Sequence, residues 1–245
     1  MFKCAIDGGA ASGKSSTARH VARRLGFGYI DTGSMFRAVT LQVLRQQVDP
    51  KDKDKVMRIA QATRLFYPSM DRVALNGEDV TEAIRTPLVT RHTSSVASNP
   101  GVREVLARLQ RQMANDTKQQ FFKAEGYKRG FHFMPGVVMD GRDIGTVILP
   151  DADLKVFMVA DAWVRAERRY KEHPQGSVQE IYEALLERDK ADTQREIAPL
   201  TKAPDAIQLD TSRMQFEDQV KTIEDLIIER IEKRWKADDE SRLFI

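Results

Sequence analysis

A glycine-rich loop close to the beginning of the chain narrows the choice of folds more than any other stretch. Gly8 and Gly13 occupy the two glycine positions of the pattern G-x-x-x-x-G-K-[ST], and Lys14 and Ser15 complete it. In such a loop the backbone N–H groups turn inward around a polyphosphate, the lysine reaches its β- and γ-phosphates, and the hydroxyl can ligate Mg²⁺. The predicted phosphate-binding residues are Gly8, Gly9, Ala10, Ala11, Ser12, Gly13, Lys14, Ser15 and Ser16.

The residues on either side of this loop predict the strand and the helix that a phosphate loop requires. Residues 2–6 form a short apolar run of the kind found in buried strands. Four apolar residues between Ala18 and Leu25 recur with helical spacing, and Gly26 follows them as a stop signal. The N-terminus of that helix would point its positive end at the phosphates. This context favours an anion-binding site over a turn that binds nothing.

Composition narrows the class of protein further. Short apolar runs alternate with helical patterns over 245 residues, which favours one α/β core with at most a modest inserted lobe. Charged residues make up 31% of the chain but leave a net charge of only +3. That balance disfavours both disorder and a surface dedicated to nucleic acid, so we do not expect nucleic acid as a partner.

Cysteine content and hydropathy bear on where the protein works. Cys4 is the only cysteine, so the chain can form neither an internal disulfide nor a cysteine-rich zinc site, and a reducing compartment is expected. No apolar run approaches 18 residues, and the glycine-rich loop begins at residue 8, so we expect neither a membrane span nor a signal peptide. The sequence therefore predicts a cytoplasmic protein, and we expect it to be a monomer.

Two further strand ends bring polar residues to the expected nucleotide site. A brief strand at residues 29–30 leads to Thr32, and Arg37 follows in the first turn of the next predicted helix. Residues 137–139 form a second buried strand that leads to Asp140. A carboxylate at a strand end beside a phosphate loop is placed to hold Mg²⁺, directly or through water.

These motifs together resemble the bacterial cytidylate kinases. The strings IDGGAASGKSS and IDTGSMFRAVT are similar to the start of that family, whose second motif is commonly DTGAMYRA. Phe36 replaces the usual tyrosine and Ser34 the usual alanine. The string DGRDIGTVILPDADLKVFMVA is close to the family's most characteristic stretch. The resemblance extends from about residue 2 to about residue 231 and is interrupted by residues 114–135.

The resemblance implies a P-loop fold of the three-layer α/β/α class, with a central parallel sheet, an inserted small lobe that binds the nucleoside monophosphate, and a helical lid. The implied division is a core at about 1–50, 136–160 and 205–235, the insert at about 51–135 and the lid at about 161–200. Within the insert, Asn76-Gly77 between two short apolar runs predicts a tight hairpin.

The resemblance also implies an activity: phosphorylation of CMP and dCMP by ATP with Mg²⁺. The implied catalytic residues are Lys14, Asp140, Arg142 and Arg195, and the implied metal site consists of Ser15, Ser16 and Asp140. CMP would be bound by Thr32, Arg37, Ser94, Arg103, Arg142, Asp143, Arg188, Asp192 and Arg195, with Ser95 left open as an alternative to Ser94. The lid would contribute Arg165, Arg168 and Arg169.

Without the resemblance, several of these residues have simpler interpretations. Arg188, Asp192 and Arg195 are spaced so that they share one helical face, which is equally typical of a salt-bridged surface helix. Their match to the pattern ERD-x-x-D-x-x-R is what assigns them to substrate binding. Ala191 stands where this family often has a further arginine, which puts one possible phosphate contact in doubt.

Residues 114–135 depart most from the family. Basic residues alternate there with Phe121, Phe122, Tyr127, Phe131 and Phe133, a mixture that could bind single-stranded nucleic acid by stacking. We favour instead a longer connection whose aromatic side chains pack on the core.

Other functions remain as alternatives. A GTPase would need the guanine-reading string Asn-Lys-x-Asp, which does not occur. The cysteine count excludes an adenylate kinase with a four-cysteine zinc lid, and only the missing motif match speaks against a zinc-free one. A kinase for UMP or AMP and a non-catalytic nucleic-acid-binding P-loop protein are the remaining rivals.

Overall fold

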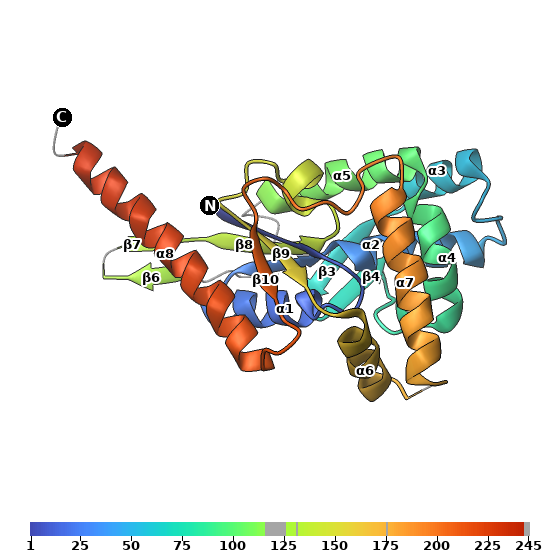
Figure 1. The fold of residues 1–245 in the computed structure, drawn as a ribbon. Helices are drawn as coiled ribbons and strands as arrows, with labels where there is room; N and C mark the ends of the chain where they lie inside the picture. Colours follow the sequence, from blue (N-terminus) through green and yellow to red (C-terminus); the bar gives the residue numbers. More distant parts are fainter. Residues whose placement is uncertain (116–125, 131, 175, 243–245) are drawn as a thin grey trace.

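The computed structural model describes residues 1–115, 126–130, 132–174 and 176–242. At its centre is a parallel sheet with the strand order β10-β9-β1-β8-β2. Helices cover both faces of the sheet (Figure 1), which confirms the predicted three-layer α/β/α class. The strands are β1 (Phe2–Gly8), β2 (Gly28–Asp31), β8 (Gly136–Gly141), β9 (Leu154–Val159) and β10 (Ile207–Asp210).

Alternate residues of β1 enter two separate apolar cores. Phe2, Cys4 and Ile6 pack with residues of α1 (Lys14–Leu25) and α8 (Phe216–Arg242). Ala5 packs on the other face, with residues of α2 (Thr32–Arg45), α3 (Lys53–Ala62) and α5 (Pro100–Asn115). Successive side chains of a strand point to opposite faces, so Asp7 shares the face of Ala5.

An antiparallel sheet follows α3, as expected for the insert. It consists of β3 (Leu65–Ser69), β4 (Arg72–Leu75) and β5 (Glu78–Asp79). Asn76 and Gly77 both have positive φ angles, 52° and 92°, which confirms the hairpin. A 3₁₀ turn (Ala83–Arg85) and α4 (Pro87–Ala97) then lead to α5. Apolar residues of the insert join the core of the main sheet, and its boundaries stay a prediction.

The predicted lid consists of α6 (Ala162–Glu172) and α7 (Val178–Gln194), which lie side by side (Figure 1). Ser177 and Glu180 form a capping box at the start of α7, so this helix begins at a strong local signal. The sequence offered no comparable signal for the π-helix at Ile144–Ile148, which directly follows the DGRD stretch.

The described part of the 114–135 segment forms a two-stranded ribbon, β6 (Tyr127–Arg129) and β7 (His132–Met134). The Tyr127 ring stacks on Trp235 of α8, with ring centroids 5.7 Å apart, as expected for an aromatic residue packed on the core. Phe133 is exposed instead. Phe121, Phe122 and Phe131 lie outside the described residues.

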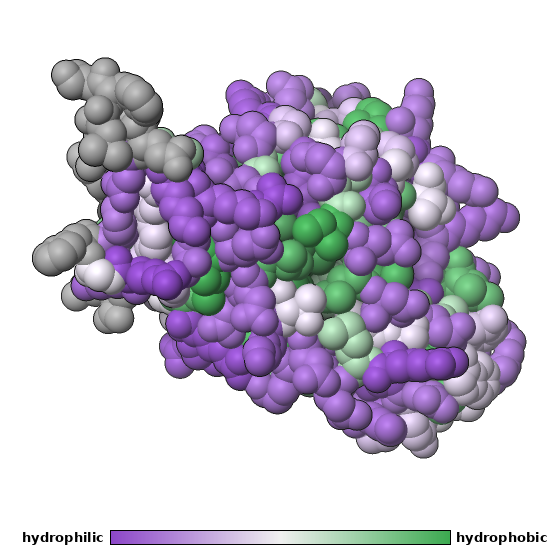
Figure 2. All heavy atoms as spheres, turned by 60° about the vertical axis from the view of Figure 1, so that its left-hand side comes forward, coloured by the Kyte–Doolittle hydropathy of each residue, from purple (hydrophilic) through white to green (hydrophobic). Residues whose placement is uncertain are grey.

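The ribbon and the C-terminal part of α8 lie on the opposite side of the molecule from α6 and α7 (Figure 1). Figure 2 shows that this side is mostly hydrophilic, with a hydrophobic area near its centre and smaller ones elsewhere. Among the described residues, no helix is both long enough and apolar enough to cross a bilayer.

Candidate active site

The glycine-rich loop has the backbone geometry that its sequence predicts. A Cβ on Gly8 would lie 2.4 Å from the carbonyl oxygen of Met158, so only glycine fits between β1 and β9. Gly13 has a φ of 87°, in the left-handed region that favours glycine, and it directly precedes α1. The positive end of the α1 dipole therefore faces the loop, as a phosphate site requires.

Lys14 is buried beside this loop, and its amine forms no ion pair with a carboxylate of the described residues. Its Nζ lies 3.5 Å from the carbonyl oxygen of Gly9. Burial lowers the pKa of Lys14 to about 7, the positive charge of Arg142 adds to that fall, and the carboxylate of Asp140 opposes it. A bound polyphosphate would supply the missing negative charge and favour the protonated amine.

Asp140 lies at the end of β8, next to the phosphate loop, because β1 and β8 are adjacent parallel strands. The Ser15 hydroxyl donates to Oδ2 at 2.6 Å, and the Tyr29 hydroxyl donates to Oδ1 at 2.8 Å. Burial raises the pKa of Asp140, Asp31 adds to the rise, and Lys14 opposes it. Thr32 donates to the carbonyl oxygen of Asp140 at 2.8 Å and so links β2 to this strand end.

The donor atoms at this point suit Mg²⁺ better than a transition metal. The Ser15 hydroxyl and the Asp140 carboxylate offer only oxygen, and Mg²⁺ typically completes its shell with waters and substrate phosphates. Among the described residues no group of three or more His, Cys, Asp or Glu side chains could hold a metal by itself. Ser16, the third residue of the predicted metal set, is exposed, and no hydrogen bond within the described chain joins its hydroxyl to Asp140.

Asp143 lies between two arginines from distant parts of the chain. Arg103 of α5 donates to its Oδ2 at 2.6 Å, and Nη2 of Arg195 lies 3.6 Å from Oδ1. The Arg103 guanidinium also lies over the Phe36 ring, 5.4 Å from its centroid, where a cation–π contact supports it. The structure thus brings together three of the residues assigned to CMP.

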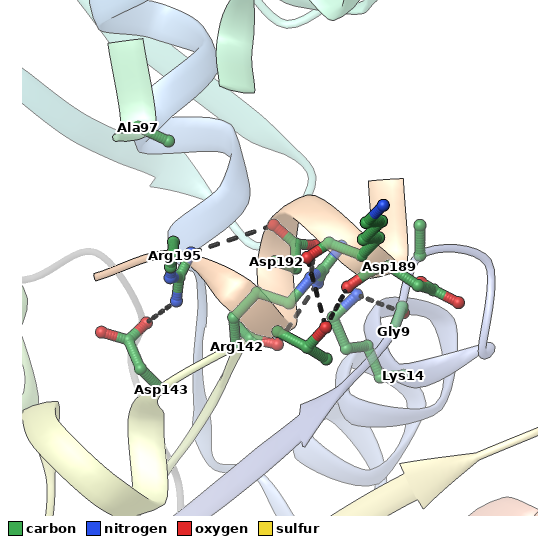
Figure 3. A network of polar contacts seen from close by, with 12 residues as sticks. Gly9, Lys14, Ala97, Arg142, Asp143, Asp189, Asp192 and Arg195 are labelled. Carbon is green, nitrogen blue, oxygen red and sulfur yellow. Dashed lines mark hydrogen bonds and ion pairs between the residues drawn. The ribbon is translucent and has the colours of Figure 1, made fainter. Parts of the chain in front are cut away.

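A second charged group joins the lid to the core (Figure 3). Arg142 Nε donates to Asp192 at 2.8 Å, and Nη1 of Arg195 lies 3.9 Å from the same carboxylate. Arg188 is half-buried nearby, and no hydrogen bond or ion pair within the described residues engages its guanidinium. Burial, together with the positive charge of Arg142, lowers the pKa of Arg188 to about 10, and the charge of Asp192 opposes this fall. This concentration of cations is suited to an anionic ligand.

The three lid arginines have different environments. Arg165 reaches the phosphate loop, where it donates to the carbonyl oxygen of Ala10 at 3.1 Å and to Asp189 at 2.6 Å. Arg168 donates to Thr211 at the turn after β10. Arg169 is 44% exposed and pairs with Glu172 on its own helix. Of the three, only Arg165 lies against the phosphate loop.

Arg37, Ser94 and Ser95, which were also predicted to contact CMP, lie outside these two charged groups. Arg37 lies 3.9 Å from the Asp31 carboxylate, and its buried Nε lacks a partner within the described residues. Ser95 donates to the carbonyl oxygen of Pro50 at 3.2 Å, whereas Ser94 is exposed. The hydroxyl of Ser94 is therefore the freer of the two, although the structure does not bring it into contact with Asp143.

Sequence reasoning missed two acidic residues. Asp189, beside Arg188 in the ERD string, contacts Arg165, and its buried Oδ1 has no hydrogen-bond partner in the described chain. Asp7, the only charged residue in the stretch from Cys4 to Gly13, accepts backbone hydrogen bonds from Ile144 and Gly145. A carboxylate in a buried strand was the available signal for Asp7.

Comparison with known proteins identifies the family. The model of the cytidylate kinase family matches residues 4–232. A cytidylate kinase of Limosilactobacillus reuteri (strain DSM 20016) is 45% identical over 92% of this chain and 95% of its own. Those of Chlorobaculum tepidum and Bacillus cytotoxicus are 44% and 42% identical, each over 94% of this chain and over 94% and 97% of their own. The resemblance seen in the motifs is confirmed, and the chain belongs to the cytidylate kinase family.

Proposed function

We propose that this protein transfers the γ-phosphoryl group of ATP to CMP or dCMP, giving ADP and CDP or dCDP. One observation carries the proposal: the buried Asp143 carboxylate lies between Arg103 and Arg195. Asp143 follows shortly after Asp140, whose carboxylate lies beside the phosphate loop. A phosphate loop alone supports any P-loop enzyme, whereas an aspartate–arginine pair beside it supports a reader of one particular base.

The charge balance of the site supports phosphoryl transfer. Transfer of a γ-phosphoryl group has a loose, highly charged transition state, so positioning and charge stabilisation matter more than a general base. Lys14 would face the β- and γ-phosphates of ATP, and Arg142 and Arg195 would face the transferred group. Thr32, Arg37, Arg142 and Arg195 would hold the acceptor phosphate, with Arg188 as a further cation that makes no direct ion pair within the described structure.

Ser15 and Asp140 are the residues that would hold Mg²⁺ together with ATP. Their oxygens are 2.6 Å apart, and the Tyr29 hydroxyl fixes the orientation of the Asp140 carboxylate. When bound, the ion would neutralise charge on the β- and γ-phosphates.

The proposed base recognition distinguishes cytosine from uracil. Cytosine presents an N4 amine and the acceptors N3 and O2, which suit the Asp143 carboxylate and the Arg103 guanidinium. Uracil would place O4 against the carboxylate and N3–H against the arginine. Each buried unpaired group costs roughly 1–3 kcal/mol, so kcat/KM for CMP should exceed that for UMP by on the order of 100-fold.

The substitution Asp143→Ala tests this recognition. Most CMP activity should be lost and the CMP/UMP ratio of kcat/KM should fall, because the carboxylate that selects the amine is gone. A coupled ADP-release assay with AMP, GMP, CMP, UMP and dCMP measures both quantities. Glu229→Ala is a suitable control, since Glu229 pairs with Lys233 on the exposed side of α8. Equal use of UMP or AMP by the unsubstituted protein would contradict the proposal.

The alternative of a nucleic-acid-binding protein has less support. In the described part of the 114–135 segment, Arg129 is paired with Glu232 and His132 lies 3.5 Å from Asp239. Lys128 lies over the Phe133 ring. These basic groups already have partners of their own, which leaves less positive charge for a nucleic-acid backbone.

A further inference from the structure

Asp7 is a buried carboxylate that the proposed reaction does not use. It is 5% exposed and lies near the end of β1, just before the phosphate loop. The strand turns its side chain away from α1 and α8 and toward the π-helix at Ile144–Ile148. Its Oδ1 accepts the N–H of Ile144 at 2.8 Å, and its Oδ2 accepts the N–H of Gly145 at 2.7 Å. Both carboxylate oxygens are therefore committed to one short helix.

The two N–H groups belong to the first two residues of that helix. N–H groups at this position have no acceptor within the helix itself. The residue at the N-cap position is Asp143. Aspartate at an N-cap ordinarily accepts such N–H groups with its own side chain. Here Asp143 makes no side-chain cap, and its carboxylate faces Arg103 and Arg195 instead. A residue 136 positions earlier in the chain performs the capping in its place.

Burying the charged Asp7 carboxylate costs free energy, and its raised pKa reflects this cost. Burial raises the pKa of Asp7 to about 6, and the nearby charge of Asp143 adds to the rise. The hydrogen bonds from Gly145 and Ile144, together with the charge of Arg142, oppose it. An asparagine would be cheaper to bury, but it has only one acceptor oxygen and its amide would face the second N–H. The ionised carboxylate is the side chain of this size that satisfies both donors.

We propose that Asp7 is a positioning residue for base selection: by capping the helix at Ile144–Ile148, it leaves the Asp143 carboxylate free to face Arg103 and the cytosine amine. Asp7 touches neither nucleotide and acts through Asp143. The inference rests on the proposed role of Asp143 in reading the base.

Asp7→Asn tests the proposal with nearly unchanged volume. The N–H that loses its acceptor would compete for the Asp143 carboxylate and turn it away from the base. We expect the CMP/UMP ratio of kcat/KM to fall about tenfold or more, because the Asp143 carboxylate would exchange its hydrogen bond to the base for one to the helix. KM for CMP should rise several-fold more than KM for ATP. A merely structural role would instead lower activity with CMP and UMP alike.

Two further variants separate this role from a general effect on the sheet. Asp153 accepts the N–H of Lys3 at 2.7 Å at the other end of β1, so Asp153→Asn is a matched control that should keep the wild-type ratio. In an Asp143→Ala background, Asp7→Asn should lower the ratio no further. Circular dichroism establishes folding, and Asp7→Ser replaces Asp7→Asn if the latter does not fold.

The outcomes test the role of Asp7 separately from the role of Asp143 in base selection. A selective wild type whose ratio survives Asp7→Asn, or Asp7→Ser in its place, would overturn the role of Asp7 while leaving that of Asp143. A further fall of the ratio in the Asp143→Ala background would overturn it as well. A wild type that does not prefer CMP would refute the proposed function itself.

Discussion

The arginine and aspartate side chains of this site already form ion pairs with one another. Arg103 pairs with Asp143, Arg142 with Asp192, and Arg165 with Asp189. Such pairs keep the arginines oriented, and an entering phosphate can exchange for a carboxylate at modest cost. Lys14 differs, because among the described residues its amine has only the Gly9 carbonyl within hydrogen-bond distance.

Lys14→Ala should nearly abolish turnover while leaving the fold intact. The lysine charge is needed more strongly in the transition state than in the ground state, so kcat should fall by at least about 100-fold. Steady-state assays with CMP measure the loss, and urea unfolding checks the fold. Lys3→Ala, in β1 before the loop and paired with Asp151, is the control. A wild-type kcat in Lys14→Ala would refute the assignment of this loop to ATP.

The buried charge of Asp7 makes stability depend on pH. Its pKa is about 6 in the folded protein against a usual 3.8, so its contribution to stability is fully present below pH 3.8 and is lost as the pH rises through 6. Between pH 7 and pH 4.5 the wild type should therefore gain roughly 2 kcal/mol in unfolding free energy relative to Asp7→Asn. Urea unfolding of both proteins across this range measures the difference. A difference that is independent of pH, or grows toward high pH, would contradict the assignment.

Residues whose role is local could be predicted from the sequence, and residues whose role depends on distant contacts could not. Gly8, Gly13 and Lys14 belong to one contiguous pattern. Asp7 and Asp189 were missed because their partners, Ile144 and Arg165, are 137 and 24 positions away. No local period or motif links such pairs, and only the folded sheet and lid bring them together.

At the scale of elements, the lid contacts the phosphate loop through a hydrogen bond from Arg165 and through Ala10, which packs with Ala166 and Leu185. Arg165 of α6 bridges the Ala10 carbonyl and Asp189 of α7. A Cβ on Gly9 would lie 3.2 Å from both Arg165 Nη1 and Asp189 Oδ1, so the acidic group lies directly against the loop. The helices themselves could be predicted from periodicity and the capping box, whereas this contact could not.

Asp189→Asn should strengthen ATP binding, and Arg165→Ala should weaken it. The Asp189 carboxylate competes with phosphate for Arg165 and repels it, so its neutralisation should lower KM for ATP by roughly three- to tenfold. Loss of the guanidinium should raise KM by a similar factor. Steady-state kinetics and calorimetry with a non-hydrolysable ATP analogue measure both changes. Lys171→Ala, at an exposed position of α6 that has no assigned role, is the control. If both substitutions raised KM, the ion pair would be a structural brace rather than a competitor of ATP.

At the scale of the whole molecule, the site and the described part of the 114–135 segment lie apart. The ribbon of β6 and β7 packs on Trp235 of α8, on the opposite side of the molecule from the lid (Figure 1). The parallel sheet and its two helical layers could be predicted, because each strand and helix has its own sequence signal. The ribbon could not, since its strands are short and depend on α8 for burial.

Replacing residues 117–133 by a short linker should leave CMP phosphorylation within several-fold of normal. The replacement removes Tyr127 and His132, whose rings stack on Trp235, but it touches none of the residues assigned to ATP or CMP. Stability should fall by about 1–3 kcal/mol, because a largely buried tryptophan loses two aromatic neighbours. Trp235→Ala in the full chain is the matched variant: it should cost about 3–5 kcal/mol and likewise leave KM for CMP and ATP unchanged. Urea unfolding and steady-state kinetics on both proteins separate the two effects. If activity collapsed in a truncated protein that remained folded, the segment would have to act in the site, and the distance between ribbon and lid would have to close during turnover.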